Sequence, residues 1–203
     1  LRPGQRGYED ADLPSDIAKR NLYEHGRTML HKAGYIDIGM DHFALPIDEL
    51  AIAQSQSRLH RNFMGYTVTQ TDLLVGLGAS SISDAHFAYA QNTKKVEEYE
   101  ALVNMNELPA FKGHIQTEAD LAIKRSILDL ACHGFLASDL LERTVDDDIV
   151  KQLAAMQEEG IVERTSEGLH ITTAGRPFVR NICSVFDKRM RNKQVDQVFS
   201  KSI

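Results

Sequence analysis

The stretch from Ser15 to Met40 limits the fold more than any other part of the chain, because a helical pattern passes into a strand pattern through a single glycine. Ser15 is a suitable N-cap, and a loose apolar stripe then runs to Gly34, which predicts a helix over residues 16–33. The next residues, YIDIGM, alternate in hydrophobicity and predict a strand over 35–40. Helix, glycine and strand in this order are typical of an α/β layered or barrel domain.

The predicted strand ends in GMDHFALP, which places an acid beside an imidazole. In parallel α/β barrels and open sheets, the loops at the C-terminal ends of the strands bind ligands. Asp41 and His42 are therefore candidates for a binding site. The alternative is a turn that Asp41 caps and in which local contacts satisfy His42.

The composition is that of a globular protein. With 203 residues, of which 42% are hydrophobic, the chain can build the core of one large domain or two small ones. Its formal net charge of −6 gives no general attraction to nucleic acid or anionic lipid. No apolar stretch approaches the ~20 residues that cross a bilayer, and the start lacks the layout of a signal peptide. We expect a soluble, cytoplasmic protein without a membrane span.

The sequence has two cysteines, Cys132 and Cys183, each within a helical pattern. Buried thiols are a better interpretation than a disulfide or a reactive pair. A metal site would need more ligands than these two supply, so the chain is predicted to contain no metal ligand.

The middle of the chain is less regular. IDELAIAQSQ indicates a short helix, whereas SRLHRNFMGYTV fits neither a helical nor a strand period and suits a pocket rim or a surface loop. TDLLVGLGASSIS indicates an apolar strand broken by Gly76 and Gly78, where the backbone approaches a ligand or a neighbouring strand, or simply bulges. A helix over 94–106 follows, and the breakers in ELPAFKGH mark a domain boundary near residue 113.

The last third predicts a winged-helix-like outline. Thr117 and Asp120 resemble a capping box, and the helix that they begin stops near Gly134. DDIVKQLAAMQEEG predicts another helix, IVERTS and LHITTA predict a hairpin, and a helix follows Pro177. One row of this last helix is Phe178, Ile182, Phe186 and Met190.

Two functions fit these residues without any further information. The first is a small-molecule site at the strand ends, beside the turn of residues 76–83. Its residues are Asp41, His42, Arg61, Asn62, Phe63 and Tyr66. Asp and His exchange protons near neutral pH, Arg holds carboxylates in a fork, and glycines admit a bulky cofactor.

The second function is nucleic-acid binding by the winged-helix-like module. The basic residues that favour it are Lys188, Arg189, Arg191 and Lys193. Acidic residues around the preceding helix would repel phosphate, and they are Asp146, Asp147, Asp148, Glu158 and Glu159. We therefore expect no nucleic-acid partner.

Five motifs together indicate a family: GYIDIGMDHFALPIDELAIAQ, LHRNFMGYTV, DLLVGLGASSIS, YAQN and GLHITTAGRPFVRNICSVFD. In these motifs the chain resembles, over practically its whole length, the oxygen-independent coproporphyrinogen III oxidases. These enzymes, also called coproporphyrinogen dehydrogenases, are radical S-adenosylmethionine (SAM) oxidoreductases of haem biosynthesis. The resemblance implies oxidative decarboxylation of two propionates of coproporphyrinogen III to vinyl groups, giving protoporphyrinogen IX. It also implies a 4Fe–4S cluster that cleaves SAM, and an electron acceptor of unknown identity.

The cluster motif of this family, C-x3-C-x2-C, is missing from the chain. Three thiolates bind three irons and leave the fourth for SAM, which the two separate cysteines cannot do. The chain also opens on LRPGQRGYEDADLPS without an initiating Met, and it looks cut from a longer protein. The resemblance then implies an α/β fold in which residues 1–113 end a radical SAM partial barrel. Residues 114–203 form a mostly helical C-terminal domain with a winged-helix-like hairpin, which covers the substrate opening. We expect no turnover by this piece alone.

The resemblance also carries site residues onto this chain. It implies SAM contacts at Ile82 in the S-x-I-S turn and at Phe63 and Met64 in the RNFxGYT loop. Many family members have Gln where this chain has Met64, so any polar contact of that amide is lost here.

The resemblance also places the substrate pocket around the GMDHFA and RNFxGYT motifs. Its expected residues are Asp41, His42, Arg61, Asn62 and Tyr66. The Arg61 guanidinium either pairs with a substrate propionate or braces the loop by pairing with Asp72 or Glu49. No residue is assigned a catalytic step.

A haem-binding or haem-carrying protein of the same superfamily is the alternative outside catalysis. It is suggested by the histidines of the first part of the chain, which are His25, His31, His42, His60 and His86. Scattered histidines are more often surface or core residues.

Overall fold

The structure is a computed structural model, and it describes residue 7 and residues 12–191. Its first element is α1 (Asp16–Lys32). The Ser15 hydroxyl accepts a hydrogen bond of 3.3 Å from the Ala18 amide, and so satisfies one of the free N–H groups of the first turn. The predicted helix and its N-cap are confirmed.

The helix α1 leads into a hairpin. β1 (Ile36–Gly39) pairs antiparallel with β2 (His42–Ala44), and Gly39 lies opposite His42. Gly39 and Met40 both have positive φ, at 154° and 51°, which allows the chain to reverse within two residues. The predicted strand is confirmed, and Asp41 lies in the hairpin turn that follows it.

A second hairpin follows the short helix α2 (Glu49–Ser55), which confirms the helix predicted in IDELAIAQSQ. β3 (His60–Asn62) pairs antiparallel with β4 (Gly65–Thr67). The prediction of an irregular segment at SRLHRNFMGYTV is therefore wrong. Strands of three residues are too short for a period of two to stand out from the sequence.

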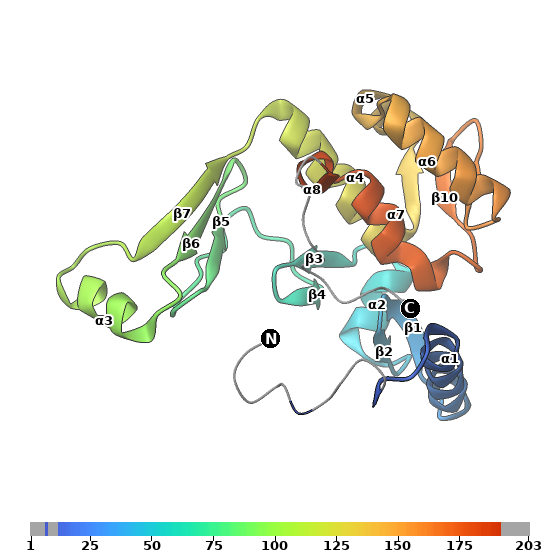
Figure 1. The fold of residues 1–203 in the computed structure, drawn as a ribbon, viewed down its shortest axis with the longest axis horizontal. Helices are drawn as coiled ribbons and strands as arrows, with labels where there is room; N and C mark the ends of the chain where they lie inside the picture. Colours follow the sequence, from blue (N-terminus) through green and yellow to red (C-terminus); the bar gives the residue numbers. More distant parts are fainter. Residues whose placement is uncertain (1–6, 8–11, 192–203) are drawn as a thin grey trace.

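An arm extends from the rest of the molecule (Figure 1). It consists of an antiparallel sheet in the order β5-β6-β7 and of a helix that connects the last two strands. The elements are β5 (Ile82–Asp84), β6 (Ala88–Asn92), α3 (Val96–Asn104) and β7 (Ala110–Ile115). The helix α3 confirms the one predicted over 94–106.

The glycine-rich stretch before β5 is a loop, where the sequence predicts a broken strand. Its one bridge joins Leu74 and Asp84 through N–O contacts of 2.8 and 2.9 Å. A Cβ on Gly76 would lie 2.7 Å from the carbonyl oxygen of Ile82. Glycine is therefore required here because the loop approaches a neighbouring strand.

The C-terminal part has the element order of a winged helix. It runs through α4 (Glu118–His133), β8 (Phe135–Ala137), α5 (Ser138–Thr144), α6 (Asp147–Glu158), β9 (Val162–Arg164) and β10 (Gly168–Ile171). The sheet order is β8-β10-β9, with β10 in the middle. The predicted outline is confirmed, and so is the capping box of Thr117 and Asp120 at the start of α4. The sequence patterns do not predict β8 and α5.

The end of the described chain departs from the prediction of one continuous helix. A 3-10 turn, η2 (Arg176–Phe178), leads into α7 (Val179–Val185), and Phe186 is the C-cap. A separate short helix, α8 (Lys188–Arg191), follows. Ile182 and Phe186 are fully buried, as their place in the apolar row predicts.

Two groups of buried side chains share α4. The larger group lies between the helices and the sheet of the C-terminal part, and its most buried members include Leu130, Leu136, Ile149, Leu169, Ile182 and Phe186. The smaller group lies under the two N-terminal hairpins and α2. It consists of Ile38, Ala44, Ala51, Ala53, Leu59 and Cys132. The domain boundary near residue 113 stays a prediction, and β7 passes through that residue.

The described strands form four antiparallel sheets of two or three strands and no closed barrel. None of the helices within residues 12–191 is both long enough and apolar enough to cross a bilayer.

Candidate functional site

Four of the predicted site residues gather where the two N-terminal hairpins meet α4, and they are Asp41, His42, Arg61 and Tyr66. Tyr66, on β4, donates a hydrogen bond of 2.8 Å from its hydroxyl to the carbonyl of Ala131 near the end of α4. Burial raises the pKa of Tyr66 to about 12, so the phenol keeps its proton and acts as a donor. A Cβ on Gly39 would overlap the Tyr66 ring and hydroxyl. The GMDHFA and GYT motifs are therefore in contact.

Asp41 and His42 lie at the outside of this contact. The His42 imidazole packs edge to face on Tyr66 with ring centroids 5.2 Å apart, and its Nδ1 lies 3.1 Å from the Asp41 carboxylate. The Asp41 side chain is 71% exposed. The pair therefore borders solvent, where it can contact a ligand that approaches the hairpin.

Arg61 lies on the inner side of the same tyrosine. Its guanidinium carbon is 5.0 Å from the centre of the Tyr66 ring, and Nη1 is buried with no hydrogen-bond partner in the described part of the chain. The brace expected through Asp72 or Glu49 is wrong, because among the described residues Arg61 forms an ion pair with neither.

Two thiols lie near the Arg61 guanidinium. Burial raises the pKa of Cys132 to about 11 and that of Cys183 to about 12, while the nearby Arg61 charge lowers both by a smaller amount. Both thiols are therefore neutral and do not balance the charge of Arg61. Cys132 and Cys183 are free and buried, as predicted.

The turn between β3 and β4 holds the remaining residues of the RNFxGYT motif. The Asn62 carboxamide oxygen accepts a hydrogen bond of 2.8 Å from the Met64 amide and fixes the turn. Phe63 is half exposed, whereas Met64 is 90% exposed. Phe63 packs edge to face on Tyr89 of β6, with ring centroids 5.2 Å apart and an interplanar angle of 78°. The turn thus reaches the arm.

Ile82 lies on the strand next to Tyr89. In the antiparallel register Ile82 faces Gln91 and Asp84 faces Tyr89, so these four side chains share one face of the sheet. The loop before Ile82 is held by the buried Asn92, whose amide donates hydrogen bonds of 3.0 Å to the carbonyls of Gly76 and Gly78. Of the predicted SAM contacts, Phe63 therefore packs on Tyr89, and Ile82 shares a sheet face with Tyr89.

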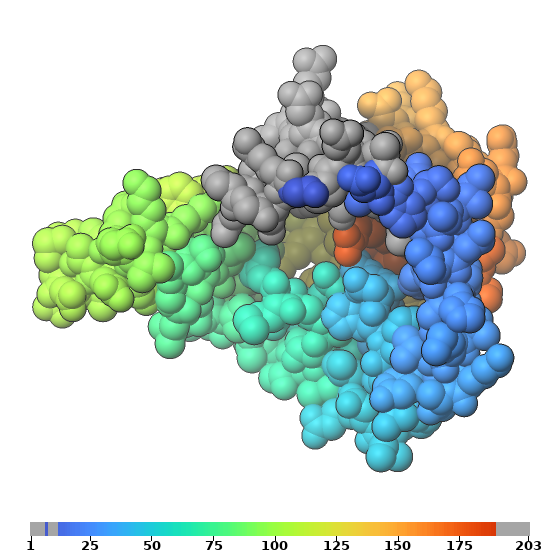
Figure 2. All heavy atoms as spheres, turned by 60° about the horizontal axis from the view of Figure 1, so that its bottom comes forward, coloured from blue at the N-terminus to red at the C-terminus, as the bar shows by residue number. Residues whose placement is uncertain are grey.

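Sequence reasoning missed the side chain that joins this face to α4. Lys124 Nζ lies 2.7 and 3.0 Å from the two carboxylate oxygens of Asp84, and 4.8 Å from the centre of the Tyr89 ring. No sequence motif predicts a pair whose members lie so far apart along the chain. Figure 2 shows the arm, green, beside the β3–β4 hairpin, teal.

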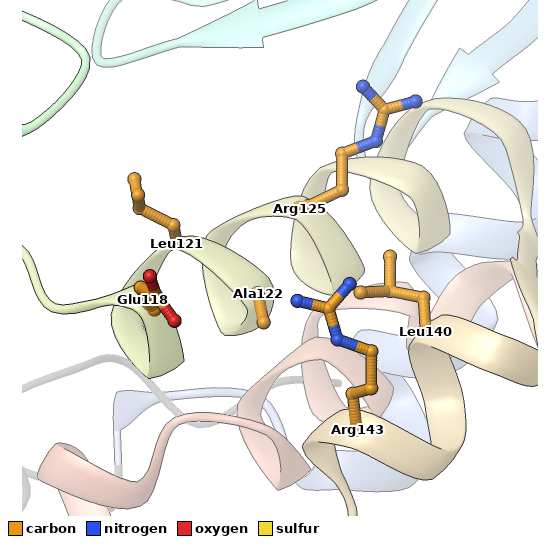
Figure 3. A pocket seen from close by; sticks show the side chains of 6 residues that line it. All are labelled: Glu118, Leu121, Ala122, Arg125, Leu140 and Arg143. Carbon is orange, nitrogen blue, oxygen red and sulfur yellow. The ribbon is translucent and has the colours of Figure 1, made fainter.

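Two cavities lie elsewhere. A groove of about 380 Å³ between α4 and α5 is lined by Glu118, Leu121, Ala122, Arg125, Leu140 and Arg143 (Figure 3). A cavity of about 340 Å³ lies between the N-terminal hairpin, the end of α4 and β10, with Arg27, Asp37, His133 and His170 among its lining residues. Neither is lined by Phe63, Met64, Ile82 or Arg61.

The basic run that favours nucleic-acid binding is partly neutralised. Lys188 forms an ion pair of 3.1 Å with Asp146, and Arg189 binds the Asp120 carboxylate at 3.0 Å. The exposed side of α6 carries Asp147, Asp148 and Glu158. Lys193 lies outside the described residues. The absence of a nucleic-acid partner stays a prediction.

The described residues contain no group of three or more His, Cys, Asp or Glu side chains that could hold a metal ion. Three of the five N-terminal histidines contact different residues: His31 binds Asp37, His42 binds Asp41, and His86 packs on Phe87. These contacts give no support to the haem-carrier alternative.

Comparisons with known proteins match the resemblance that the motifs indicate. The oxygen-independent coproporphyrinogen III oxidase of Synechocystis sp. is 36% identical over 100% of this chain, and that of Escherichia coli is 37% identical over 98%. The solved structure of coproporphyrinogen III oxidase from Escherichia coli, described as a radical SAM enzyme, matches 91% of the chain with a TM-score of 0.82 and 36% identity. No protein-family model matches.

The chain spans under half the length of these relatives: 46% of the Synechocystis protein, 45% of the Escherichia coli protein and 44% of the solved chain. The resemblance to the oxygen-independent coproporphyrinogen III oxidases is confirmed along the whole chain. The fold is that of the matching part of the radical SAM enzyme.

Proposed function

We propose that this chain supplies the C-terminal part of an oxygen-independent coproporphyrinogen III oxidase. The intact enzyme would convert two propionates of coproporphyrinogen III to vinyl groups and give protoporphyrinogen IX without oxygen. The observation that carries the proposal is the combination of 36% identity and a TM-score of 0.82 with the solved structure of a coproporphyrinogen III oxidase. Sequence and fold agree over the same residues, which random similarity does not produce.

The 4Fe–4S cluster that this function implies does not fit the residues of the chain. A cluster of this kind is held by three or four cysteine thiolates, whereas Cys132 and Cys183 are buried as neutral thiols. The cluster ligands would have to come from sequence outside this chain.

SAM fits better, because the predicted contacts present apolar side chains. Phe63 offers a half-exposed ring, and Ile82 lies on β5, in the same sheet as the Tyr89 on which Phe63 packs. An aromatic face and a branched aliphatic side chain suit the nucleoside of SAM, which when bound supplies the radical that the reaction needs. Met64 would contribute contact area in the place where a Gln amide stands in many relatives.

The substrate would approach the outer side of the two hairpins. The hairpin residues Asp41 and His42 border solvent, and Asn62 lies in the β3–β4 turn. All three would contact the tetrapyrrole directly. Arg61 would bind a propionate that reaches the inner side of Tyr66, because its Nη1 has no partner among the described residues and a guanidinium binds carboxylates in a fork. Tyr66 would hold both hairpins against α4 through Ala131.

The winged-helix part, residues 114–203, would cover the substrate opening rather than bind nucleic acid. The partner that accepts the final electron is a further component that this chain does not identify. On the strength of the resemblance we also propose that the enzyme acts in the cytoplasm.

The test is an anaerobic assay of the whole protein that contains this chain, after reconstitution with iron and sulfide. With coproporphyrinogen III, SAM and a reductant, we expect protoporphyrinogen IX, measured as the fluorescent porphyrin after oxidation. The 203-residue chain treated in the same way is the control, and it should bind no cluster and form no product. Failure of the reconstituted whole protein to consume coproporphyrinogen III would refute the proposal.

A further inference from the structure

The side chain of Lys124 contacts a neighbour of each of two predicted SAM contacts, Ile82 and Phe63. From α4 it reaches Asp84 on the strand that carries Ile82, and it also reaches the ring of Tyr89, on which Phe63 packs. The pair of Lys124 and Asp84 joins residues that are 40 positions apart. The contact is therefore a tertiary one, in contrast to the ion pairs within single helices.

The surroundings of Lys124 make this contact specific. The side chains of Lys124 and Asp84 are 25% and 24% exposed, so solvent screens their attraction less than at an open surface. The ammonium group also lies over the face of an aromatic ring at 4.8 Å, which adds a cation–π interaction. Asp84 is fixed in turn, because its backbone pairs with Leu74 and its Oδ1 accepts a hydrogen bond of 3.0 Å from the His86 amide.

The sheet geometry links the contacts of Lys124 to the predicted SAM contacts Ile82 and Phe63. Ile82 and Asp84 are two residues apart on β5 and point to the same side, so fixing the Asp84 carboxylate fixes the direction of Ile82. Tyr89 faces Asp84 across the sheet and supports Phe63 from the arm.

We propose that Lys124 is a positioning residue that sets the spacing between Phe63 and Ile82 and thereby the affinity for the SAM nucleoside. This inference rests on the proposed function, because it takes Phe63 and Ile82 as the SAM contacts. Lys124 acts through Asp84 and Tyr89, and it has no part in the chemistry of SAM or of the substrate.

The test compares variants of the reconstituted whole protein in SAM titrations and in steady-state kinetics. Lys124→Met keeps the length of the side chain but removes its charge, and we expect about a tenfold rise in the Kd and KM for SAM. At saturating SAM, kcat should stay within about twofold of the wild type, because the reacting groups are untouched. Lys124→Arg should restore most of the affinity, since a guanidinium also binds a carboxylate and stacks on an aromatic ring.

A matched control is available on the same helix. Arg125 is the next residue, and it also pairs with an aspartate at 2.9 Å, but its partner Asp129 lies on α4 itself. Arg125→Met removes a charge without breaking a tertiary contact, and the Kd for SAM should stay within about twofold of the wild type.

Tyr89→Leu keeps the proposal testable if Lys124→Met does not fold. This variant removes the ring between Lys124 and Phe63 while it leaves the ion pair with Asp84, and it should also weaken SAM binding. An unchanged Kd for SAM in folded Lys124→Met, or in folded Tyr89→Leu, would overturn the inference while wild-type decarboxylation still supported the proposed function. A wild-type protein that neither binds SAM nor consumes coproporphyrinogen III would overturn both.

Discussion

The Tyr66 hydroxyl donates a hydrogen bond of 2.8 Å to the carbonyl of Ala131 and joins the β3–β4 hairpin to the end of α4. The ring that carries this hydroxyl occupies the space that a Cβ on Gly39 would need. One tyrosine therefore connects the two N-terminal hairpins with the C-terminal part of the chain, and its surroundings can be tested by small substitutions.

Gly39→Ala should lower the free energy of unfolding by about 2 kcal/mol or more. The added methyl group would overlap Tyr66, and φ at this position is 154°, where alanine is strained. Urea denaturation would measure the loss. Gly26→Ala is the matched control, because Gly26 lies within α1 with no atom within 4 Å of the added carbon. It should stabilise the protein by about 0.5–1 kcal/mol, and an equal effect of the two substitutions would contradict this account.

Asp120→Ala should destabilise the chain by about 2 kcal/mol, because the Asp120 carboxylate binds groups from three elements. It caps α4 through the Thr117 amide at 3.0 Å, binds Arg189 from α8, and lies 3.2 Å from His114 of β7. Thermal unfolding would measure the effect. Asp129→Ala removes a carboxylate that pairs with Arg125 within α4, and it should change the stability by about 0.5 kcal/mol or less.

The same carboxylate should make stability depend on pH on the acid side. The Thr117 amide holds the pKa of Asp120 well below its usual range, and Arg189, the Thr117 hydroxyl and His114 lower it further. Because the folded pKa is depressed, the stabilisation is fully present above the pKa of the unfolded carboxyl, about 4, and is lost as the pH falls towards the folded pKa. Between about pH 6 and pH 2 the free energy of unfolding should decrease more steeply with falling pH for the wild type than for Asp120→Asn. An equal pH dependence of the two proteins would show that the Asp120 carboxylate is not the source of the effect.

Cys132 and Cys183 should resist thiol reagents in the folded protein at neutral pH. Burial raises their pKa values to about 11 and about 12, so only a very small fraction of either is thiolate at pH 7.5. Absorbance with an aromatic disulfide reagent should show two thiols in denaturant and a very slow reaction without it. Rapid labelling of either thiol in the native state would disprove their burial.

The sequence predicts best those features that depend on neighbouring residues. Ser15 caps α1, and Thr117 with Asp120 caps α4, because capping uses side chains within three residues of the helix start. The burial of both cysteines also follows from local pattern, since each lies among apolar residues of a helix.

Features that depend on a distant partner escape the same reasoning. The strand at residues 36–39 is visible in the sequence, but its antiparallel pairing with β2 depends on a two-residue reversal at Gly39 and Met40. The contact of Lys124 with Asp84 requires α4 and β5 to be packed together, which no local period records. Arg61 is predicted as a site residue, yet only the fold reveals that it stacks on Tyr66.

The position of Arg61 has an electrostatic consequence. Among the described residues Arg61 forms no ion pair, and the two protonated thiols near it supply no counter-charge. The guanidinium is held instead against the π face of Tyr66. A carboxylate that reached this position would exchange a weak attraction to an aromatic ring for a charge-assisted hydrogen bond.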